Sequence, residues 1–497
     1  MTSQNVTQLS AASLAAIDTA DVPAYDRSAV TAGIVHFGVG GFHRAHQAKV
    51  IDDLLARGLA DDWGICGIGV MPSDKRMRDV LEAQDNLYTL VEKHADGQLS
   101  ARVIGSIVDY IYAPDDTEAA IERMADPHIR IVSMTVTEGG YNINQVTGRF
   151  QLDDPRVAHD LGSDAPETVF GLVVEALRRR RDRGIVPFTV MSCDNLQNNG
   201  EVARHAFTTY AHAKDAELAA WIDDNVLFPN SMVDRITPVT TDEDRAEIAR
   251  QFGIDDAWPV VCEPFFQWVL QDTFTDGRPP YQEAGVEVVD DVEPYEFIKL
   301  RLLNSSHQGL CYFGHLMGYR YAHDATQDPL IAEFLLAYMN IDSTPTLKPV
   351  PGLDIEEYKP QLIERFSNPG IRDTVARLCA ESSDRIPKWL LPVVRDQLAM
   401  PEPHVRFAAA IVASWARYAE GVDEQGEPID VVDRLKERVM AAAQRYPDDK
   451  HAFLRDKELF GDLIDQPVFV EAYDRVLSSL HEVGARETLR MLLGHTS

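Results

Sequence analysis

Short apolar runs alternate with amphipathic stretches through the first 290 residues of the chain. Runs of this kind are typical of strands buried on both faces of a parallel sheet, and the stretches between them fit crossover helices. From residue 294 onward the pattern predicts helices only. This order predicts an α/β Rossmann-type dinucleotide-binding domain over residues 1–290 and a mainly α-helical substrate-binding domain over residues 291–497. The expected strands are 31–39, 63–70, 87–93, 101–112, 129–136, 188–193 and 285–289.

Residues 295–319 stand out because apolar side chains would point to almost every side of a helix built from them. Such a helix is buried, yet it carries Glu296, Lys299, Asn304 and His307. At about 100° per residue, with Lys299 at zero, the other three lie at about 60°, 140° and 80° and share one arc with it. Buried polar groups need partners or a ligand, and a desolvated lysine can act as a general base. We expect either a catalytic lysine or a Lys–Glu pair that only fixes the packing.

A glycine-rich turn follows the first predicted strand and precedes a helix expected over residues 43–55. The turn consists of Gly38, Val39, Gly40, Gly41 and Phe42. Glycines at this place let backbone N–H groups approach a pyrophosphate, so we expect these residues to bind a dinucleotide. His43 stands where the third glycine of the G-x-G-x-x-G pattern belongs, and an ordinary tight turn is the alternative.

Asp74 follows the second predicted strand, where a dinucleotide site keeps the residue that recognises the ribose. A carboxylate there accepts hydrogen bonds from the 2′-hydroxyl and favours NAD. The neighbouring Lys75 and Arg76 could instead hold a 2′-phosphate, so NADP is possible. The alternative for Asp74 is a helix N-cap.

Two further candidate segments follow buried strands. Thr137 and Glu138 come after the strand at 129–136, and Asn195 comes after the strand at 188–193. Open α/β sheets bind ligands at the carboxyl ends of their strands, so we expect Thr137 and Glu138 to contact the cofactor and Asn195 to lie at the site. An ordinary turn residue is the alternative for Asn195.

Composition and charge exclude several classes of function. The formal charge of −32 over 497 residues argues against nucleic acid or an anionic membrane as a partner. The five cysteines are scattered, and no His/Cys cluster has the spacing of metal ligands. We see no signal peptide and no apolar run long enough to span a membrane. We therefore expect a metal-independent, cytoplasmic monomer that acts on a small molecule.

Six motifs are distributed along the chain: HFGVGGFHRAHQ (36–47), TVTEGGY (135–141), FTVMSCDN (188–195), MVDRIT (232–237), WPVVCEPFFQWV (258–269) and KLRLLNSSH (299–307). Together they resemble one family, the polyol-specific long-chain dehydrogenases, also called the mannitol dehydrogenase family. The resemblance covers essentially the whole chain, and it implies a zinc-independent oxidoreductase that uses NAD or NADP.

The resemblance implies a role for each residue of the catalytic set. Lys299 would be the general base that takes the proton of the alcohol. Asn195 and Asn304 would hold the developing oxyanion or carbonyl oxygen. His307 would bind and orient the substrate, and Glu296 would offer a proton route to water. The resemblance also implies that Val233 binds the cofactor and Asp234 binds substrate hydroxyls.

The resemblance places cationic substrate contacts in the helical domain, at Arg377 and Arg385, with Lys388 in the same region. Arg385 departs from the family, whose mannitol enzymes carry lysine there, and the two residues are not interchangeable at a tight contact. Oxidation of D-mannitol to D-fructose is the favoured reaction. Reduction of fructuronate is the alternative, because an arginine could hold a uronate carboxylate. Gly139 speaks against that alternative, since the uronate enzymes tend to carry lysine at this position. Another secondary polyol is a further alternative, and a non-catalytic sugar-binding protein is disfavoured because the catalytic set is complete.

Overall fold

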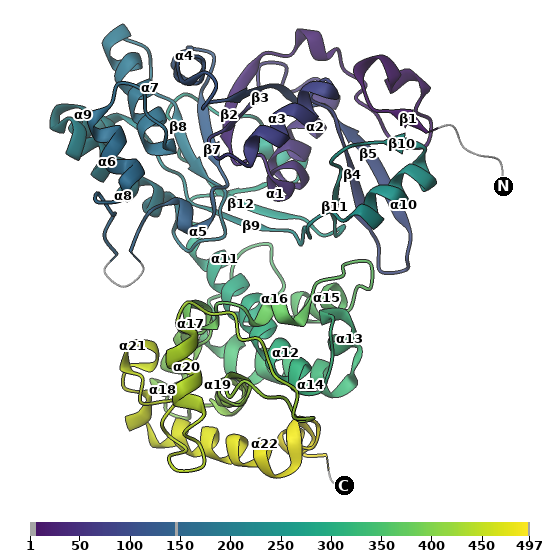
Figure 1. Cartoon of the computed structure of the whole chain (residues 1–497), viewed down its shortest axis with the longest axis vertical. Coiled ribbons are helices and arrows are strands. Elements are labelled where there is room, and N and C mark those ends of the chain that lie inside the picture. Colours follow the sequence, from purple (N-terminus) through teal and green to yellow (C-terminus); the bar gives the residue numbers. More distant parts are fainter. Residues whose placement is uncertain (1–5, 145–147, 496–497) are drawn as a thin grey trace. The chain divides into compact units, whose positions relative to one another are not determined.

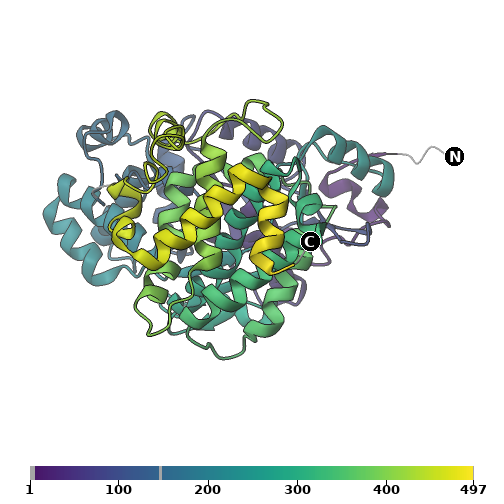
Figure 2. The same cartoon turned by 90° about the horizontal axis from the view of Figure 1, so that it is seen from below.

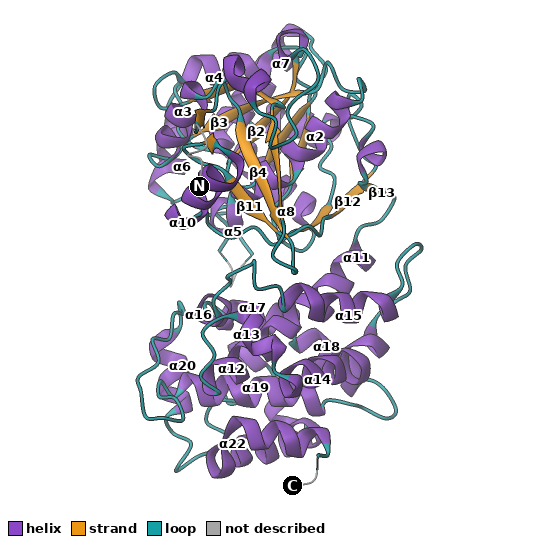
Figure 3. Cartoon of the chain, turned by 90° about the vertical axis from the view of Figure 1, so that its right-hand side faces the viewer, coloured by secondary structure: helices purple, strands orange, loops and turns teal. Residues whose placement is uncertain are grey.

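The computed structural model describes residues 6–144 and 148–495. The chain divides into two compact units, one formed by Met1–His94 and Gln98–Glu293 and the other by Ala95–Gly97 and Pro294–Ser497. Every strand of the described residues belongs to the first unit, and the second is built from helices and loops (Figure 3). The predicted fold class is therefore confirmed. The predicted domain boundary between residues 290 and 291 stays a prediction.

A parallel five-stranded sheet with the order β6-β3-β2-β7-β8 forms the centre of the first unit. Its strands are β2 (Ala32–Phe37), β3 (Gly64–Gly69), β6 (Ile107–Tyr112), β7 (Ile131–Met134) and β8 (Thr189–Ser192). Every residue of β2, β3, β7 and β8 is buried, which explains the uninterrupted apolar runs of the sequence. The chain leaves β2 toward β3 on one side and later returns to β7 on the other. The carboxyl ends of β2 and β7 therefore flank the point where open α/β sheets bind ligands.

Helices cover both faces of this sheet, and two apolar cores fill the space between (Figure 1). One core includes side chains of α4, α7, α8 and α9, and the other includes side chains of α2, α3 and the strands β9 and β12. The helices of the unit are α1 (Gly41–Ala45), α2 (Gln47–Ala56), α3 (Asp74–Ala83), α4 (Thr117–Ala125), α5 (Thr137–Gly140), α6 (Pro155–Gly162), α7 (Val169–Arg183), α8 (Asn199–Lys214), α9 (Ala216–Asn225) and α10 (Asp242–Phe252).

Three smaller sheets complete the first unit, with the orders β11-β4-β5, β13-β12-β9 and β1-β10. Their strands are β1 (Thr7–Gln8), β4 (Tyr88–Lys93), β5 (Leu99–Ile104), β9 (Ser231–Asp234), β10 (Ile254–Asp255), β11 (Val260–Cys262), β12 (Gln267–Gln271) and β13 (Glu287–Val289). The sequence did not predict β9, which is only four residues long.

Two element predictions in this unit are wrong in detail. The helix expected over 43–55 is interrupted at His46, whose φ of −122° and ψ of −93° are not helical and separate α1 from α2. The strand expected over 101–112 is two strands, because the chain leaves one sheet at Ile104 and enters another at Ile107. Periodicity alone did not reveal either break.

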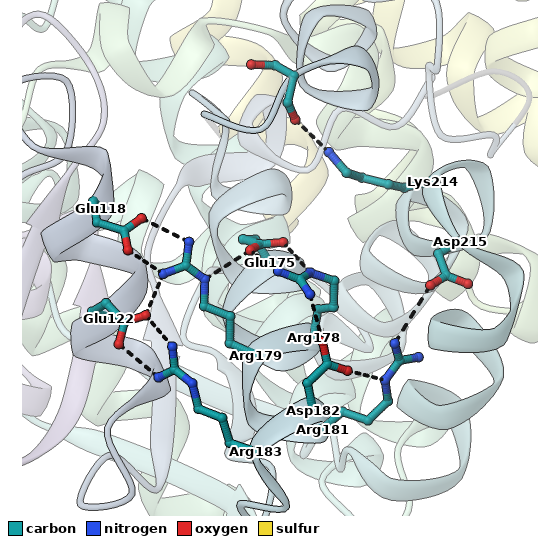
Figure 4. Close-up of polar contacts among 11 residues, drawn as sticks. Glu118, Glu122, Glu175, Arg178, Arg179, Arg181, Asp182, Arg183, Lys214 and Asp215 are labelled. Carbon is teal, nitrogen blue, oxygen red and sulfur yellow. Dashed lines mark hydrogen bonds and ion pairs between the residues drawn. The ribbon is translucent and has the colours of Figure 1, made fainter.

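A cluster of ion pairs joins α4 to α7 (Figure 4). The guanidinium of Arg179 bonds Glu118 and Glu122 of α4 and Glu175 of its own helix, and Arg183 also bonds Glu122. Three carboxylates around two arginines form a network, which stabilises more than isolated surface pairs do. This network serves the packing of the two helices.

The second unit is a helical assembly around α12 (Ser305–Leu316) and α19 (Arg406–Ala419), both of which are almost wholly buried. The C-terminal helix α22 (Pro467–Leu493) packs against α19 and is drawn in yellow in Figure 2. The remaining helices are α11 (Glu293–Ile298), α13 (Ala322–Gln327), α14 (Pro329–Ala337), α15 (Ile355–Phe366), α16 (Val375–Cys379), α17 (Ser382–Trp389), α18 (Leu391–Leu398), α20 (Lys436–Ala443) and α21 (Lys457–Phe460). In the described ranges, 6–144 and 148–495, no helix is both long and apolar enough to cross a membrane.

The segment predicted as one helix over 295–319 changes its type in the middle. It consists of α11, a π-helix η4 (Lys299–Asn304) and α12. A second π-helix, η5 (Tyr338–Ser343), follows α14. π-helical turns are rare and occur mostly as single turns at functional sites.

Candidate active site

Gly38 directly follows β2 and has a conformation that only glycine adopts easily. Its φ is +87°, and a Cβ on it would lie 2.2 Å from the carbonyl oxygen of Thr135, beyond the end of β7. The hydroxyl of Thr135 donates to the carbonyl oxygen of Gly38 at 2.8 Å and lies 3.0 Å from Nε2 of His36. Gly38 is therefore required by the close approach of two strand ends, whatever binds there.

Gly40 and Gly41 are different, because the protein itself leaves room for a side chain at both. A Cβ on Gly40 would meet its nearest atom at 3.8 Å, and one on Gly41 at 3.5 Å. Neither has a positive φ. A small space in front of backbone at the start of a helix is what a pyrophosphate needs, so this turn fits a dinucleotide. The side chains of Val39 and Phe42 pack into or against the apolar core, which leaves their backbone groups for a cofactor.

His43, in place of a third glycine, stacks on His36. The ring centroids are 3.5 Å apart and the planes differ by 14°. Burial lowers the pKa of His36 to about 3 and places the pKa of His43 well below its usual value, so both rings are neutral at ordinary pH. His43 thus fills with an aromatic ring the space that a glycine would leave, and it serves packing.

Asp74 is the first residue of α3, and its carboxylate does not cap that helix. Its Oδ2 accepts the backbone N–H groups of Val70 and Met71 at 2.9 Å each, at the end of β3. The N-cap alternative is therefore wrong. The two cations beside it have partners of their own, since the guanidinium of Arg76 lies 4.6 Å from the centre of the Trp258 ring and Nζ of Lys75 lies 3.9 Å from Asp115.

The ends of β7 and β8 bring Thr137 and Asn195 to the same edge of the sheet. Thr137 begins the short helix α5, and both Thr137 and Glu138 are exposed. Asn195 is also exposed and follows the buried Asp194. The carboxylate of Asp194 accepts the N–H groups of Val136 and Thr137 at 3.0 and 2.8 Å. Burial raises the pKa of this carboxyl, although its donors favour the charged form.

Val233 and Asp234 end β9 and are both buried. The next residue, Arg235, has no exposed side-chain surface and fixes this strand end. Its Nη1 donates to the carbonyl oxygen of Ala45 at 2.7 Å, its Nε donates to that of Glu263 at 3.0 Å, and its Nη2 pairs with Glu92. Arg235 was not predicted from the sequence, although an arginine that directly follows the predicted site residue Asp234 could have indicated a side chain that fixes this strand end.

In the second unit, Glu296, Lys299 and Asn304 lie on one continuous helical segment and are 4–6 % exposed. The predicted angle of about 140° between Lys299 and Asn304 is wrong, because it assumed α-helical turns. In a π-helix the residue five positions on takes the place that the fourth has in an α-helix. Lys299 and Asn304 are five positions apart and belong to η4, so the wide turn brings them to the same face of the segment.

His307 follows one turn later and is half-buried. Its ring packs on Phe366 of α15, with centroids 4.3 Å apart. The segment therefore presents a carboxylate, an amine, an amide and an imidazole from adjacent turns. Such a set can accept a proton, donate hydrogen bonds to an oxygen and orient a polar ligand.

Two hydroxyl groups support the π-helical turn. The carbonyl oxygen of Arg301 accepts a hydrogen bond from the hydroxyl of Tyr338 at 3.0 Å and from that of Ser343 at 3.2 Å. Both donors belong to η5. A π-turn alters the helical pairing of carbonyl groups, and these hydroxyls supply donors to one of them. Sequence reasoning did not find these residues, since nothing in a hydrophobic pattern marks a π-turn.

The two cationic candidates of the helical unit are engaged by their own surroundings. Nε of Arg377 donates to Oδ1 of Asp373 at 2.6 Å, and its Nη2 bonds the other oxygen of that carboxylate. Nη1 of Arg385 donates to the carbonyl oxygen of Leu378 at 2.9 Å, and its guanidinium lies 5.5 Å from the centre of the Trp389 ring. Asp373 was not predicted, and it neutralises the charge of Arg377.

No group of three or more His, Cys, Asp or Glu in the described residues is arranged to hold a metal ion. The predicted site residues of the first unit come from the ends of β2, β3, β7, β8 and β9, and those of the second from η4 with its flanking helices and from α16 and α17.

Comparison with known proteins gives matches along nearly the whole chain. The family model described as the mannitol dehydrogenase Rossmann domain matches residues 32–283, and the model of the mannitol dehydrogenase C-terminal domain matches residues 291–481. A mannitol 2-dehydrogenase of Pyrenophora tritici-repentis is 46 % identical over 484 residues, which are 96 % of this chain and 85 % of that protein.

Two solved structures are also similar. A mannitol 2-dehydrogenase of Pseudomonas fluorescens, in a ternary complex with NAD and D-mannitol, is 44 % identical with a TM-score of 0.87, covering 99 % of this chain and all of that one. A D-sorbitol dehydrogenase in substrate-free form is 39 % identical with a TM-score of 0.90, covering 97 % of this chain and 100 % of that one. These matches confirm the resemblance that the motifs indicated.

Proposed function

This chain belongs to the mannitol dehydrogenase family, and on that premise we propose that it is an NAD-dependent oxidoreductase that interconverts D-mannitol and D-fructose. The relative of known structure binds NAD and D-mannitol. The chain matches it over 99 % of its own length and all of the relative's.

The first unit supplies the cofactor site. The backbone of Gly38 to Phe42 lies at the N-terminus of α1, where the pyrophosphate would bind. Asp74 would receive the ribose hydroxyl, and Thr137, Glu138 and Val233 would line the rest. NAD held there would supply the acceptor for the hydride that leaves the alcohol carbon.

The second unit supplies the proton chemistry. Lys299 takes the proton from the C2 hydroxyl, and Glu296 passes it toward water. Asn304 donates a hydrogen bond to the same oxygen as its charge grows. The family resemblance gives the same role to Asn195 of the first unit. His307 orients the substrate, and Asp234 accepts hydrogen bonds from its other hydroxyls. The observation that supports this assignment is η4, a π-helical turn that begins at the buried Lys299 and ends at the buried Asn304.

The surroundings of Arg377 favour a neutral polyol over a uronate. A uronate carboxylate is best bound by two parallel N–H donors of an arginine, and Nε and Nη2 of Arg377 already bond the carboxylate of Asp373. With its charge neutralised, this arginine suits a hydroxyl. D-sorbitol is the second candidate substrate, because a D-sorbitol dehydrogenase is also similar over nearly the whole chain.

The test is a set of rate measurements on the purified enzyme. Loss of NADH absorbance is followed with D-fructose and, separately, with D-fructuronate, and each assay is repeated with NADPH. Formation of NADH is then followed with D-mannitol and with D-sorbitol. Faster turnover of D-mannitol and reduction of D-fructose with NADH support the proposal. Activity on fructuronate alone, or faster turnover of D-sorbitol than of D-mannitol, would contradict the proposed substrate pair.

Metal independence belongs to the same proposal. Prolonged treatment with EDTA should leave the rate with D-mannitol unchanged, because Lys299 rather than a metal ion takes the role of base. A rate lost with EDTA and restored by zinc would contradict it. The expectation of a cytoplasmic monomer, made from the sequence, stays a prediction.

A further inference from the structure

Asp194 is a buried carboxylate with three hydrogen-bond donors at the end of β8. Its side chain accepts the N–H groups of Val136 and Thr137, and Oδ2 also accepts the hydroxyl of Tyr141 at 2.8 Å. The residue is only 7 % exposed. A buried carboxylate with this many partners is strongly fixed, and it fixes its donors in turn.

The turn that Asp194 holds is strained. Thr137 has a φ of +66°, in the left-handed region that β-branched residues avoid. A strained residue keeps such a conformation only when its surroundings determine it. The N–H group of Thr137 bonds the carboxylate at 2.8 Å, so the strain at Thr137 and the anchor at Asp194 belong together.

The backbone of Asp194 is also fixed, on the side that leads to β9. The side-chain amide of Asn199 donates to the carbonyl oxygen of Asp194 at 3.0 Å and to that of Ser231 at 2.8 Å. The hydroxyl of Ser231 donates in turn to the carbonyl oxygen of Ser192 at 2.7 Å. One hydrogen-bonded network therefore ties the segments that follow β7 and β8 to the first residue of β9.

We propose that Asp194 is a positioning residue for the reaction. Its carboxylate keeps the turn at Thr137 and Glu138 in the conformation that binds the cofactor, and its clamped backbone sets the place of Asn195. This rests on the proposed function, in which those residues touch the cofactor and the substrate oxygen. Asp194 touches neither and acts through its neighbours.

Asp194→Asn tests the proposal. The amide has the same size as the carboxylate, but its NH₂ group cannot accept a hydrogen bond, so one of the two backbone N–H groups loses its acceptor. We expect the dissociation constant of NADH to rise by about tenfold and kcat to fall by about tenfold or more, since small misplacements of reacting groups cost rates of this order. NADH binding, measured by quenching of protein fluorescence, needs no substrate. A wrong substrate assignment would therefore leave this result intact.

Asp160 provides a matched control within the same unit. It is fully buried, and it likewise accepts two backbone N–H groups, those of Glu167 and Thr168, and one hydroxyl, that of Thr168. Asp160→Asn should lower the unfolding temperature about as much as Asp194→Asn does, with NADH binding and kcat within about twofold of the wild type. Equal effects of the two substitutions on binding and kcat would overturn the proposal.

A rescue experiment separates positioning from mere support of the fold. Glycine adopts a positive φ without strain, so Asp194→Asn should weaken NADH binding less in the Thr137→Gly background than in the wild type. Comparison with Thr137→Gly alone cancels the loss of the Thr137 side chain. An equal loss of affinity in both backgrounds would contradict the link between the anchor and the turn. If Asp194→Asn does not fold, Tyr141→Phe removes one donor and keeps the carboxylate. It should weaken NADH binding by a few-fold, and unchanged binding in that variant would then overturn the proposal.

Discussion

Two stretches of irregular backbone carry predicted site residues, and the protein holds each with a different kind of partner. At the end of β7 the backbone exposes N–H groups, and the carboxylate of Asp194 accepts two of them. In η4 the carbonyl oxygen of Arg301 needs donors, and the hydroxyls of Tyr338 and Ser343 supply them. The difference teaches that each anchor has the chemistry that the local backbone lacks, an acceptor in one place and donors in the other.

The largest effect should come from removing the amine of η4 itself. Lys299→Ala should cut turnover by about 10²–10⁴-fold, the usual worth of general acid–base catalysis, and leave NADH binding nearly intact. Steady-state rates and fluorescence titration measure the two. Lys359→Ala is the control, since Lys359 is also a buried lysine of the helical unit and pairs with Glu356 at 2.7 Å. If Lys299→Ala lowers turnover by less than about tenfold, Lys299 is not the general base.

Removing the two hydroxyls that bond Arg301 should lower kcat less than Lys299→Ala does. Unlike Asp194→Asn, it should leave NADH binding unchanged. Replacing Tyr338 by Phe and Ser343 by Ala leaves the buried carbonyl of Arg301 without these donors, which costs about 1–3 kcal/mol of stability. We expect kcat to fall by about tenfold, because Lys299 and Asn304 lose their alignment, while NADH binding stays unchanged.

A matched pair of hydroxyls controls for that experiment. Tyr312 and Ser382 are buried in the same unit and bond each other at 2.5 Å, and the hydroxyl of Ser382 donates to the carbonyl oxygen of Cys379, outside η4. Tyr312→Phe with Ser382→Ala should lower stability and keep kcat within about threefold. If both double variants lower kcat equally, the π-turn has no special role in alignment.

The two anchored stretches also mark the limits of the sequence prediction. Uninterrupted apolar runs predicted β2, β3, β7 and β8, because strands buried on both faces leave such runs. The glycine turn located the end of β2 through a backbone requirement that only glycine meets. By contrast, the segment 295–319 that contains η4 carries apolar residues in almost every direction, so no periodicity could distinguish a π-turn from an α-turn.

Long-range partners were beyond the sequence for a related reason. Tyr338 and Ser343 lie 37 and 42 residues from Arg301, and nothing in the chain announces that pairing. Asp194 directly precedes the predicted site residue Asn195, but its role depends on donors in the segment after β7, which the sequence does not reveal.

Asp74 allows the strand ends to be tested without touching Asp194. Asp74→Asn keeps an acceptor for the N–H groups of Val70 and Met71 and removes the charge that would face a ribose hydroxyl. We expect the preference for NAD over NADP to fall by about tenfold, because a carboxylate both attracts the 2′-hydroxyl and repels a 2′-phosphate. The ratio of kcat/KM for the two cofactors measures this. Equal losses with both cofactors would mean that Asp74 only holds the turn after β3.

The smallest effect on turnover should come from Asp342 of η5, a carboxylate that repeats the pattern of Asp194 at the start of α19. Its Oδ2 accepts the N–H groups of Phe407 and Ala408 at 2.9 and 2.7 Å, and burial raises its pKa from 3.8 to about 7. Between those two pH values the folded protein holds a proton that the unfolded chain has released. Asp342 therefore makes the free energy of unfolding fall as pH rises through this range, by about 1.4 kcal/mol per pH unit at the steepest. Asp342→Asn should remove this part of the pH dependence, measured by urea unfolding from pH 4.5 to 7.5, and leave kcat at pH 7 within about twofold. Parallel stability profiles for wild type and variant would show that this carboxyl titrates as it does in the unfolded chain.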